Sequence, residues 1–343
     1  MPDTRFGGLA TMIGSLPYKD ANKAVAIVLR YQIDMPAWPQ LPKRAYVENM
    51  YTQYSEGFPG IVVTKDKTYV NRNQDLTKPL ERFYTDYLAN NYAKYAVTAE
   101  YAAGLYRFLS LGSLSTRTVK GQVTGPVSWG LTVTDETGKA IIYDETFADV
   151  VPKFLRLKAT WMEQTLKKLN KNTVVFLDEP YMTVFGSVGM QLSREQVINL
   201  LNETLAGISG IKGIHCCGNT DWSLLLQTKI DIINFDAYNY ASTLAIYAAE
   251  VKKFLDRGGV IAWGIIPTST EAILKESVPS LRDRLEEAMV PFTRQGIPIK
   301  KLVEQSLLTP ACGLPTVTEE AAERALQLLA ELSQTIKKKY LQN

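Results

Sequence analysis

The stretch Val174-Val175-Phe176-Leu177-Asp178-Glu179-Pro180 sets the pattern of this chain, because a short apolar run ends there in two acidic residues and a proline. A helical pattern follows at residues 194–205, and a second apolar run follows at residues 213–216. Short apolar runs are typical of buried strands, and strands that alternate with helices pair in parallel. This strand–helix–strand unit therefore predicts an α/β fold.

The same alternation extends along the whole chain. Further strands are predicted at residues 9–13, 61–63, 119–123, 230–235, 260–264 and 302–307, and further helices at residues 20–31, 143–169, 244–255, 280–293 and 319–338. Roughly eight strands predict a closed (β/α)8 TIM barrel, in which residues 1–343 form a single domain. The region 64–118 is less regular, and its tyrosine-rich part is predicted to be a surface or packing helix.

The composition is that of a protein with a large core. Of the 343 residues, 46% are hydrophobic, and 38 basic residues against 35 acidic ones give a net charge of +3. This balance does not favour nucleic acid or a membrane surface as a partner, and neither is expected. We find no apolar run long enough to span a bilayer and no signal peptide. Three cysteines form no disulfide framework, so a cytoplasmic protein is expected.

Polar side chains that could carry chemistry directly follow the predicted strands. They are Ser15, Asp178, His215, Cys217, Asp236 and Cys312. In (β/α)8 barrels the catalytic residues lie at the C-terminal ends of the strands. The positions of these side chains therefore support both the predicted fold and a single site at that end of the barrel.

The only histidine and all three cysteines lie in two short segments, His215-Cys216-Cys217 and the turn around Cys312. Strand side chains alternate with a period of two, so His215 and Cys217 are expected to point to one side and Cys216 to the other. Imidazole and thiolate ligands together favour zinc. Asp236 is predicted as the fourth ligand. The alternatives are a buried core histidine beside small apolar cysteines, and a helix cap at Asp236.

Five motifs that occur in series resemble a known family. They are Ile13-Gly14-Ser15-Leu16-Pro17, Val119-Lys120-Gly121-Gln122-Val123-Thr124-Gly125-Pro126, Leu177-Asp178-Glu179-Pro180, His215-Cys216-Cys217 and Pro310-Ala311-Cys312-Gly313-Leu314. The chain resembles the C-terminal catalytic barrel of the cobalamin-independent methionine synthases, within the uroporphyrinogen-decarboxylase-like superfamily. The resemblance implies an S-methyltransferase that depends on zinc and converts homocysteine to methionine.

The resemblance also implies roles for single residues at a zinc centre. The residues that match the family's zinc ligands are His215, Cys217, Asp236 and Cys312. Together with Asp178, the histidine and the two cysteines are expected to be catalytic. The family's zinc carboxylate is usually a glutamate, and Asp236 is one methylene shorter.

The homocysteine site is implied in the same way. Ile13 and Ser15 match the residues that hold the substrate backbone, and Asp178 matches a carboxylate that binds its amino group. A second such carboxylate in the family is matched here by Gln40, which can form hydrogen bonds but adds no charge. Glu48 lies nearby in the sequence and is expected to substitute for the missing carboxylate.

The expected methyl donor follows from two departures from the family. The chain is expected to be a stand-alone barrel without the second, N-terminal barrel of the full-length synthases. Segments 75–79 and 127–130 match the family's folate-contacting segments only loosely. A methylcorrinoid, either methylcobalamin or a methylated corrinoid protein, is therefore the expected donor. Methyltetrahydrofolate is the alternative donor.

Three other functions stay open. A methylcorrinoid could serve a different thiol of the coenzyme M type, although Asp178 and Ser15 do not suit a sulfonate. A decarboxylase of the uroporphyrinogen type needs several arginines for its substrate, and the N-terminal segment offers only Arg5 and Arg30. A scaffold or corrinoid-binding partner with a structural zinc would not be an enzyme.

Overall fold

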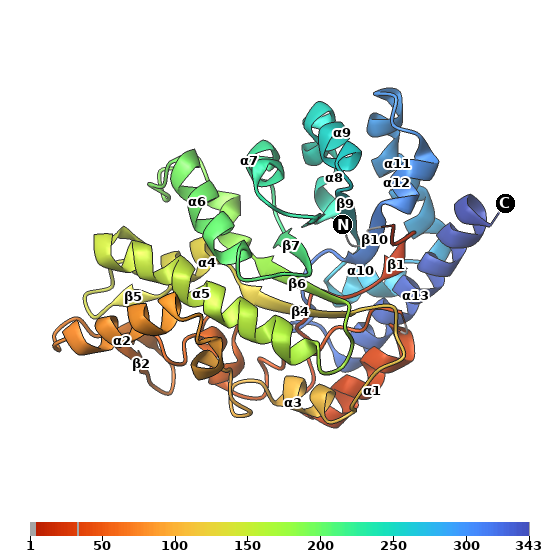
Figure 1. Cartoon of the computed structure of the whole chain (residues 1–343). Coiled ribbons are helices and arrows are strands. Elements are labelled where there is room, and N and C mark those ends of the chain that lie inside the picture. The colour runs from red at the N-terminus through yellow and green to blue at the C-terminus, as the bar shows by residue number, and fades with distance from the viewer. Residues whose placement is uncertain (1–4, 33, 343) are drawn as a thin grey trace.

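The computed structural model describes residues 5–32 and 34–342 and contains one large parallel sheet (Figure 1). Within the described residues this sheet has seven strands in the order β1-β10-β9-β8-β7-β6-β4. Their bounds are Leu9–Ala10 (β1), Val119–Thr124 (β4), Thr173–Asp178 (β6), Ile211–Cys216 (β7), Ile232–Phe235 (β8), Val260–Ile266 (β9) and Ser306–Pro310 (β10). Every neighbouring pair is parallel, which confirms the predicted α/β fold.

The segment 36–40 lies between the two outer strands of this sheet, β1 and β4. Isolated parallel bridges join Gln40 to Ser15 on one side and Ala37 to Lys120 on the other. Two residues of the segment are prolines, which have no N–H to donate to a neighbouring strand. The segment therefore contacts β4 and the residues that follow β1 without forming a regular ladder, and the sheet itself has seven strands among the described residues where roughly eight were predicted.

Two predicted strands take other places in the structure. Strand β2 (Ile61–Val63) pairs antiparallel with β3 (Thr68–Val70), which pairs with β5 (Thr134–Asp135) in a separate small sheet. The predicted strand 302–307 is mostly helix α12 (Ile299–Glu304), and β10 begins only at Ser306. Apolar residues lie on both sides of this boundary and form one short apolar run in the sequence. Such a run can belong to a buried helix or to a buried strand, so the sequence does not show where one ends and the other begins.

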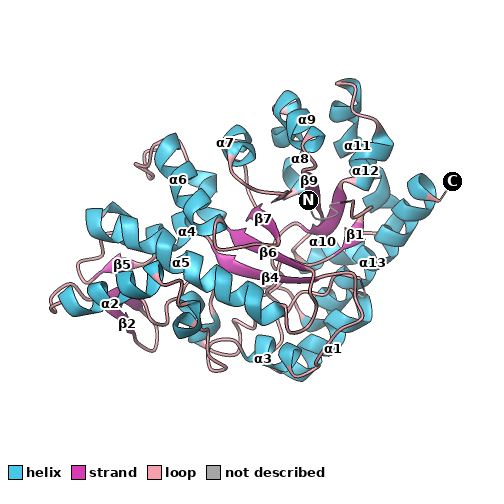
Figure 2. Ribbon diagram, viewed as in Figure 1, coloured by secondary structure: helices cyan, strands magenta, loops and turns pink. Residues whose placement is uncertain are grey.

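Helices surround the strands (Figure 2). Their bounds are Ala21–Tyr31 (α1), Thr77–Leu88 (α2), Ala103–Leu109 (α3), Pro126–Thr132 (α4), Glu145–Leu166 (α5), Arg194–Leu205 (α6), Trp222–Gln227 (α7), Ala237–Ala245 (α8), Ala248–Asp256 (α9), Thr270–Lys275 (α10), Val278–Arg294 (α11) and Glu319–Leu341 (α13). The predicted helix 244–255 is thus divided between α8 and α9. None of the described helices is long and apolar enough to cross a membrane.

The region 64–118, which the sequence left irregular, contains α2, α3 and the short 3-10 helix η3 (Tyr92–Tyr95). Other 3-10 helices lie outside it, namely η1 (Tyr46–Glu48), η2 (Thr52–Tyr54), η4 (Ile141–Tyr143) and η5 (Pro180–Val184). The tyrosine-rich part of this region packs with α5: the Tyr95 and Phe154 ring centroids are 5.7 Å apart. The prediction of a packing helix there holds for α2, from which Phe83 enters the same aromatic cluster.

Alternate strand residues face the two sides of the large sheet, and this alternation positions the site. On β6, Val174 and Phe176 belong to a small buried cluster on one face, while Val175 and Leu177 belong to the large core under the helices. The small cluster consists of Phe6, Leu9, Met35, Val174, Phe176, Ile211, Ile232, Val260, Ala262 and Leu307. Asp178 continues the first series by the period-two rule, so it lies beyond this cluster at the C-terminal end of β6.

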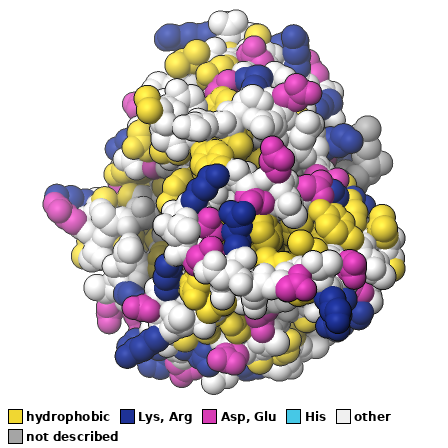
Figure 3. Space-filling model, turned by 90° about the vertical axis from the view of Figure 1, so that its left-hand side faces the viewer, with side chains coloured by type: hydrophobic (Ala, Val, Ile, Leu, Met, Phe, Trp, Pro, Cys, Tyr) yellow, Lys and Arg dark blue, Asp and Glu magenta, His cyan; other side chains and the backbone are white. Residues whose placement is uncertain are grey.

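Charged side chains of both signs are interspersed on the face that carries β2, β5 and α2 (Figure 3). This arrangement agrees with the nearly balanced composition of 38 basic and 35 acidic residues. Exposed ion pairs of this kind contribute little to stability. The charged groups that contribute most to stability are therefore expected among the buried ones.

Buried Glu163 ties α5 to the turn that precedes β7. Its carboxylate accepts hydrogen bonds from the Ser209 N–H at 3.0 Å, the Ser209 hydroxyl at 2.9 Å and the Gly210 N–H. Burial raises the pKa of Glu163, but these hydrogen bonds and Lys167 outweigh burial and hold the pKa below its usual value. The ionised carboxylate therefore stabilises the folded chain at neutral pH.

We expect Glu163→Gln to lower the free energy of unfolding at pH 7 by about 1–3 kcal/mol, because an amide cannot accept all three hydrogen bonds. Urea denaturation checks this. A depressed pKa gives stability that is lost as the pH falls through the folded-state value, so the difference from wild type should shrink in acid. Glu271→Gln is the control, since the Glu271 side chain is 80% exposed. Equal stability of the Glu163 variant and wild type would contradict this role.

Candidate metal centre and substrate cavity

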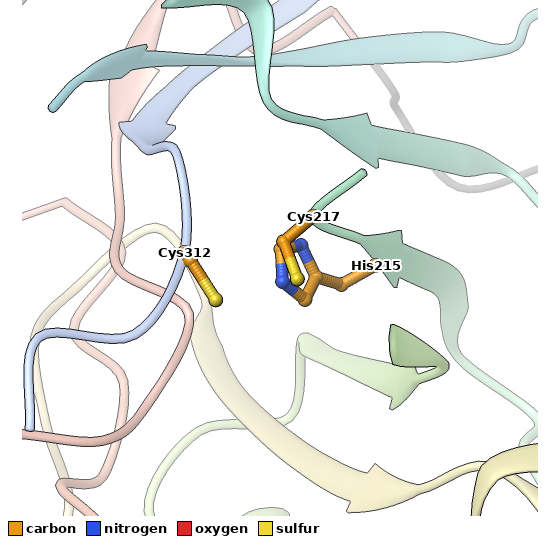
Figure 4. Close-up of side chains that lie close together, drawn as sticks. All are labelled: His215, Cys217 and Cys312. Atoms are coloured by element: carbon orange, nitrogen blue, oxygen red, sulfur yellow. The ribbon is translucent and has the colours of Figure 1, made fainter. Parts of the chain in front are cut away.

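His215, Cys217 and Cys312 point toward one another (Figure 4). His215 lies near the end of β7, Cys217 directly follows that strand, and Cys312 lies in the turn after β10. Their candidate ligand atoms all lie within 4.8 Å of one another. The predicted His-x-Cys geometry is present: Cys216 points away into the large core, and its thiol contacts the Gly218 carbonyl oxygen at 3.6 Å.

The donor set fits a zinc ion. Among the described residues the buried Nε2 of His215 has no hydrogen-bond partner, while Nδ1 is hydrogen-bonded to Asn234 Oδ1. A buried nitrogen without a partner is unusual and calls for an explanation such as a missing ion. One imidazole nitrogen and two sulfurs at this spacing match the ligands of catalytic zinc sites that keep one position for substrate.

The two thiols of this group interact strongly. A hydrogen bond from Cys312 lowers the pKa of Cys217, and His215 lowers it further against the effect of burial. The same interaction and burial raise the pKa of Cys312. One thiolate is thus readily formed at this place, and metal ligation requires the second thiol to lose its proton as well.

Asp236 has a different partner in the structure. It is the N-cap of α8, where its two carboxylate oxygens accept hydrogen bonds from the Asn239 N–H at 2.8 Å and the Asn239 side-chain amide at 2.7 Å. The group of close metal-ligating atoms found among the described residues does not include it. Its assignment as fourth ligand stays a prediction, and the helix cap is the role that the geometry gives it.

One cavity of about 410 Å³ adjoins the three ligands. Eight of the predicted site residues line it, namely Ile13, Ser15, Gln40, Glu48, Asp178, His215, Cys217 and Cys312. None of the described lining residues is a lysine or an arginine. Asp236, the ninth predicted site residue, is not among the described lining residues. The cavity thus brings carboxyl, amide and hydroxyl side chains together with the imidazole and the two sulfurs.

Asp178 is buried beside His215, its register partner on β7. Burial raises its pKa to about 6, and the nearby His215 and Lys120 oppose the rise. Its buried Oδ1 has no hydrogen-bond partner among the described residues. Lys120 is fully buried and donates to the Ile13 carbonyl oxygen at 2.7 Å. Asp178 therefore offers an unused acceptor to a ligand in the cavity.

The amide of Gln40 is oriented by a chain of hydrogen bonds. Gln53 Nε2 donates to the Tyr101 carbonyl oxygen at 2.7 Å, so Gln53 must present Oε1 to Gln40. Gln40 Nε2 donates to that oxygen at 2.7 Å. The remaining Gln40 Oε1 faces Gly14, where an added Cβ would lie only 2.7 Å away. Gln40 thus lines the cavity with an amide of fixed orientation, which carries no charge.

Glu48 is buried and forms an ion pair with Arg44 through Oε1. Its Oε2 is buried without a hydrogen-bond partner in the described part of the chain. Burial raises its pKa, while the hydrogen bond from Arg44 opposes the rise. Glu48 thus lies at the cavity as expected, but Arg44 already offsets its charge.

Glu179, from one of the quoted motifs, contacts the helix that begins at the end of another, α4. The buried carboxylate of Glu179 accepts hydrogen bonds from the N–H groups of Val127 at 3.0 Å and Ser128 at 2.7 Å, in the first turn of α4. The Ser128 hydroxyl donates to it at 2.6 Å. A carboxylate is stabilised at a helix N-terminus. Glu179 therefore links the end of β6 to α4, which is a structural role.

Two residues of this site, Asn234 and Gln53, were not predicted from the sequence. Both are buried amides, and each orients a residue at the cavity. Asn234 has a sequence signal, because it is a polar residue inside an apolar run and lies two positions before Asp236. Gln53 has none that we can identify, since it lies in the short 3-10 helix η2.

Comparisons with known proteins agree with this geometry. No family model matches. A methionine synthase of Methanocaldococcus jannaschii is 23% identical over 221 residues, which is 64% of this chain and 65% of the relative. The chain thus spans about 65% of the length of that relative. These findings and the structural likeness below confirm the resemblance to the cobalamin-independent methionine synthases.

Two solved structures share the fold. A B12-independent methionine synthase from Shewanella sp. W3-18-1, in complex with selenomethionine, has a TM-score of 0.62 and 14% identity, over 98% of this chain and 99% of the other. A methyltransferase from Methanosarcina mazei has a TM-score of 0.53 and 13% identity, over 91% of this chain and 84% of the other.

We expect Cys217→Ser and Cys312→Ser to lower zinc affinity by more than about 100-fold, because even residues that only support a metal ligand contribute about 10- to 100-fold. Competition with a chromogenic chelator measures this. Cys216→Ser is the matched control, since its side chain points into the core, and it should keep one zinc per chain. Wild-type affinity in both ligand variants would show that the assignment is wrong.

Proposed function

We propose that the chain is a zinc-dependent S-methyltransferase that methylates the thiol of homocysteine to give methionine. The observation that carries this proposal is the cavity itself: the two sulfur ligands and the imidazole line it together with Asp178, whose buried Oδ1 has no hydrogen-bond partner among the described residues. An aminothiol has a thiol that suits the metal ligands and an amino group that suits the carboxylate of Asp178. The relative named methionine synthase and the two structural neighbours support the class of reaction.

The amino group of the substrate is assigned to Asp178 and Gln40. A protonated amine has only hydrogens to donate, and both residues offer acceptors at the cavity. Asp178 supplies the charge and Gln40 supplies a neutral, oriented carbonyl. Ile13 and Ser15 line the same cavity and are assigned to the substrate backbone. The absence of lysine and arginine among the described lining residues disfavours a sulfonate or a polycarboxylate substrate.

The residues of the metal centre would bring the substrate sulfur into a reactive state. His215, Cys217 and Cys312 would hold a zinc ion, with Asp236 proposed as a further ligand. When bound, zinc supplies a positive charge that favours the thiolate form of the substrate. In the transfer, a bond forms between this sulfur and the methyl carbon as the bond from the donor to that carbon breaks.

A methylcorrinoid is the donor that the residues favour. Its cob(I) leaving group needs no proton, whereas the folate nitrogen of methyltetrahydrofolate must be protonated as it leaves. The only histidine of the chain belongs to the metal centre, so no histidine is left to act as this acid. Methyltetrahydrofolate is the second candidate, and the likeness to a protein described as B12-independent favours it.

We also propose that the sheet closes into a (β/α)8 barrel. The segment 36–40 would serve as the eighth strand, because it is bridged to residues next to both outer strands. The structural likeness to the Shewanella protein over nearly its whole length supports this arrangement. In such a barrel the cavity would lie at the C-terminal ends of the strands, where active sites of this fold lie.

We expect methionine to form when zinc-loaded protein is mixed without oxygen with homocysteine and methylcobalamin. The loss of methylcobalamin, followed by absorbance, should equal the methionine produced. A parallel mixture with methyltetrahydrofolate tests the second donor, and 2-mercaptoethanesulfonate tests a different thiol. Cys312→Ser protein is the control for uncatalysed transfer. If neither donor methylates homocysteine faster than this control, the proposed reaction is wrong.

We expect Asp178→Asn to weaken homocysteine binding by about 10- to 100-fold, because a hydrogen bond to a charged group is worth about 1.5–3 kcal/mol. Titration calorimetry measures this, and zinc content should not change. The matched control ligand is 4-mercaptobutyrate, which has the thiol and carboxylate but no amino group. Its affinity should be the same in variant and wild type. An equal loss for both ligands would remove Asp178 from the amino-group site.

A further inference from the structure

We infer that Asn234 is a positioning residue that keeps the proton of the His215 imidazole on Nδ1, so that the lone pair of Nε2 faces Cys217 and Cys312. The inference rests on the proposed metal site but not on methyl transfer. Asn234 lies on β8 and is fully buried. Its register partner on the neighbouring strand β7 is His215, so the two side chains lie side by side.

The orientation of the Asn234 amide is fixed by its other partners. Its Nδ2 donates to the Ala262 carbonyl oxygen at 2.8 Å and to the Thr309 hydroxyl oxygen at 2.9 Å. A backbone carbonyl can only accept, so the atom that contacts it must be the amide nitrogen. The carbonyl oxygen of Asn234 is therefore the atom that faces His215.

The oriented amide determines where the imidazole carries its proton. Asn234 Oδ1 can only accept, so the hydrogen bond to His215 requires a proton on Nδ1. A neutral imidazole has a single N–H, and its Nε2 then carries a lone pair. That nitrogen is buried and has no hydrogen-bond partner in the described part of the chain, and His215 belongs to the group of residues whose ligand atoms lie close together.

The hydrogen bonds join four neighbouring strands. They run from Thr309 on β10 and Ala262 on β9, through Asn234 on β8, to His215 on β7. An amide is suited to this position because one end donates twice and the other end accepts. An aspartate would keep the acceptor for His215 but leave the Ala262 carbonyl without its donor. A leucine of similar size would remove both functions.

The single histidine of the chain makes a direct test possible. In protein labelled with 15N-histidine, one imidazole gives the whole NMR signal, and the coupling pattern identifies the protonated nitrogen. The spectrum is recorded without metal, at alkaline pH where the imidazole is neutral, and again with zinc. The zinc-free spectrum keeps the inference testable even if the proposed metal site or methyl transfer fails. We expect the proton on Nδ1 in both states.

Substitutions of Asn234 by residues of similar size distinguish its effect on the His215 imidazole from its contribution to packing. Asn234→Asp should keep the proton on Nδ1. Asn234→Leu should move it toward Nε2 and weaken zinc binding by about 10- to 100-fold, as expected for residues that orient a metal ligand. A proton on Nε2 in wild type would overturn the inference, and so would Asn234→Leu protein that keeps Nδ1–H and wild-type zinc affinity. If Asn234→Leu does not fold, the wild-type spectra decide.

Discussion

The parallel register of the strands is the constraint on which the site depends. Asp178, His215, Asn234 and Ala262 are successive register partners on β6, β7, β8 and β9. A single row across the sheet therefore contains the proposed amino-group ligand, a proposed metal ligand and the amide that orients it. The row borders the apolar cluster that contains Phe176, and Ala262 belongs to both, so packing of this cluster holds the polar side chains of the row in place.

Much of this arrangement could be predicted from the sequence, because it follows from alternation. The His-x-Cys spacing alone places His215 and Cys217 on one side, and the structure agrees. The segment 36–40 could not be assigned, since its prolines remove the ladder that defines a strand. Asp236 shows a different limit: an acidic residue after a strand suits both a metal ligand and a helix cap, and the sequence does not choose between them.

The cavity contains acceptors that the protein leaves unused. The Asp178 Oδ1 and Glu48 Oε2 atoms are buried without partners among the described residues, and such groups cost free energy until a ligand satisfies them. The cations nearby do not bind these atoms: Lys120 donates to a backbone carbonyl, and Arg44 pairs with the other oxygen of Glu48. A ligand that donates hydrogen bonds to these oxygens would therefore gain binding free energy. This favours an ammonium group over an anionic group.

The neighbouring cysteines at the end of β7, Cys216 and Cys217, have a consequence for folding. A slip of one residue in the register of a strand moves every side chain to the opposite face. A slipped β7 would bring Cys216 to the cavity and turn His215 and Cys217 into the core, which leaves one soft ligand where there were two. Binding of the proposed ion would therefore favour the correct pairing over the slipped one, so it would also select the register of the sheet during folding.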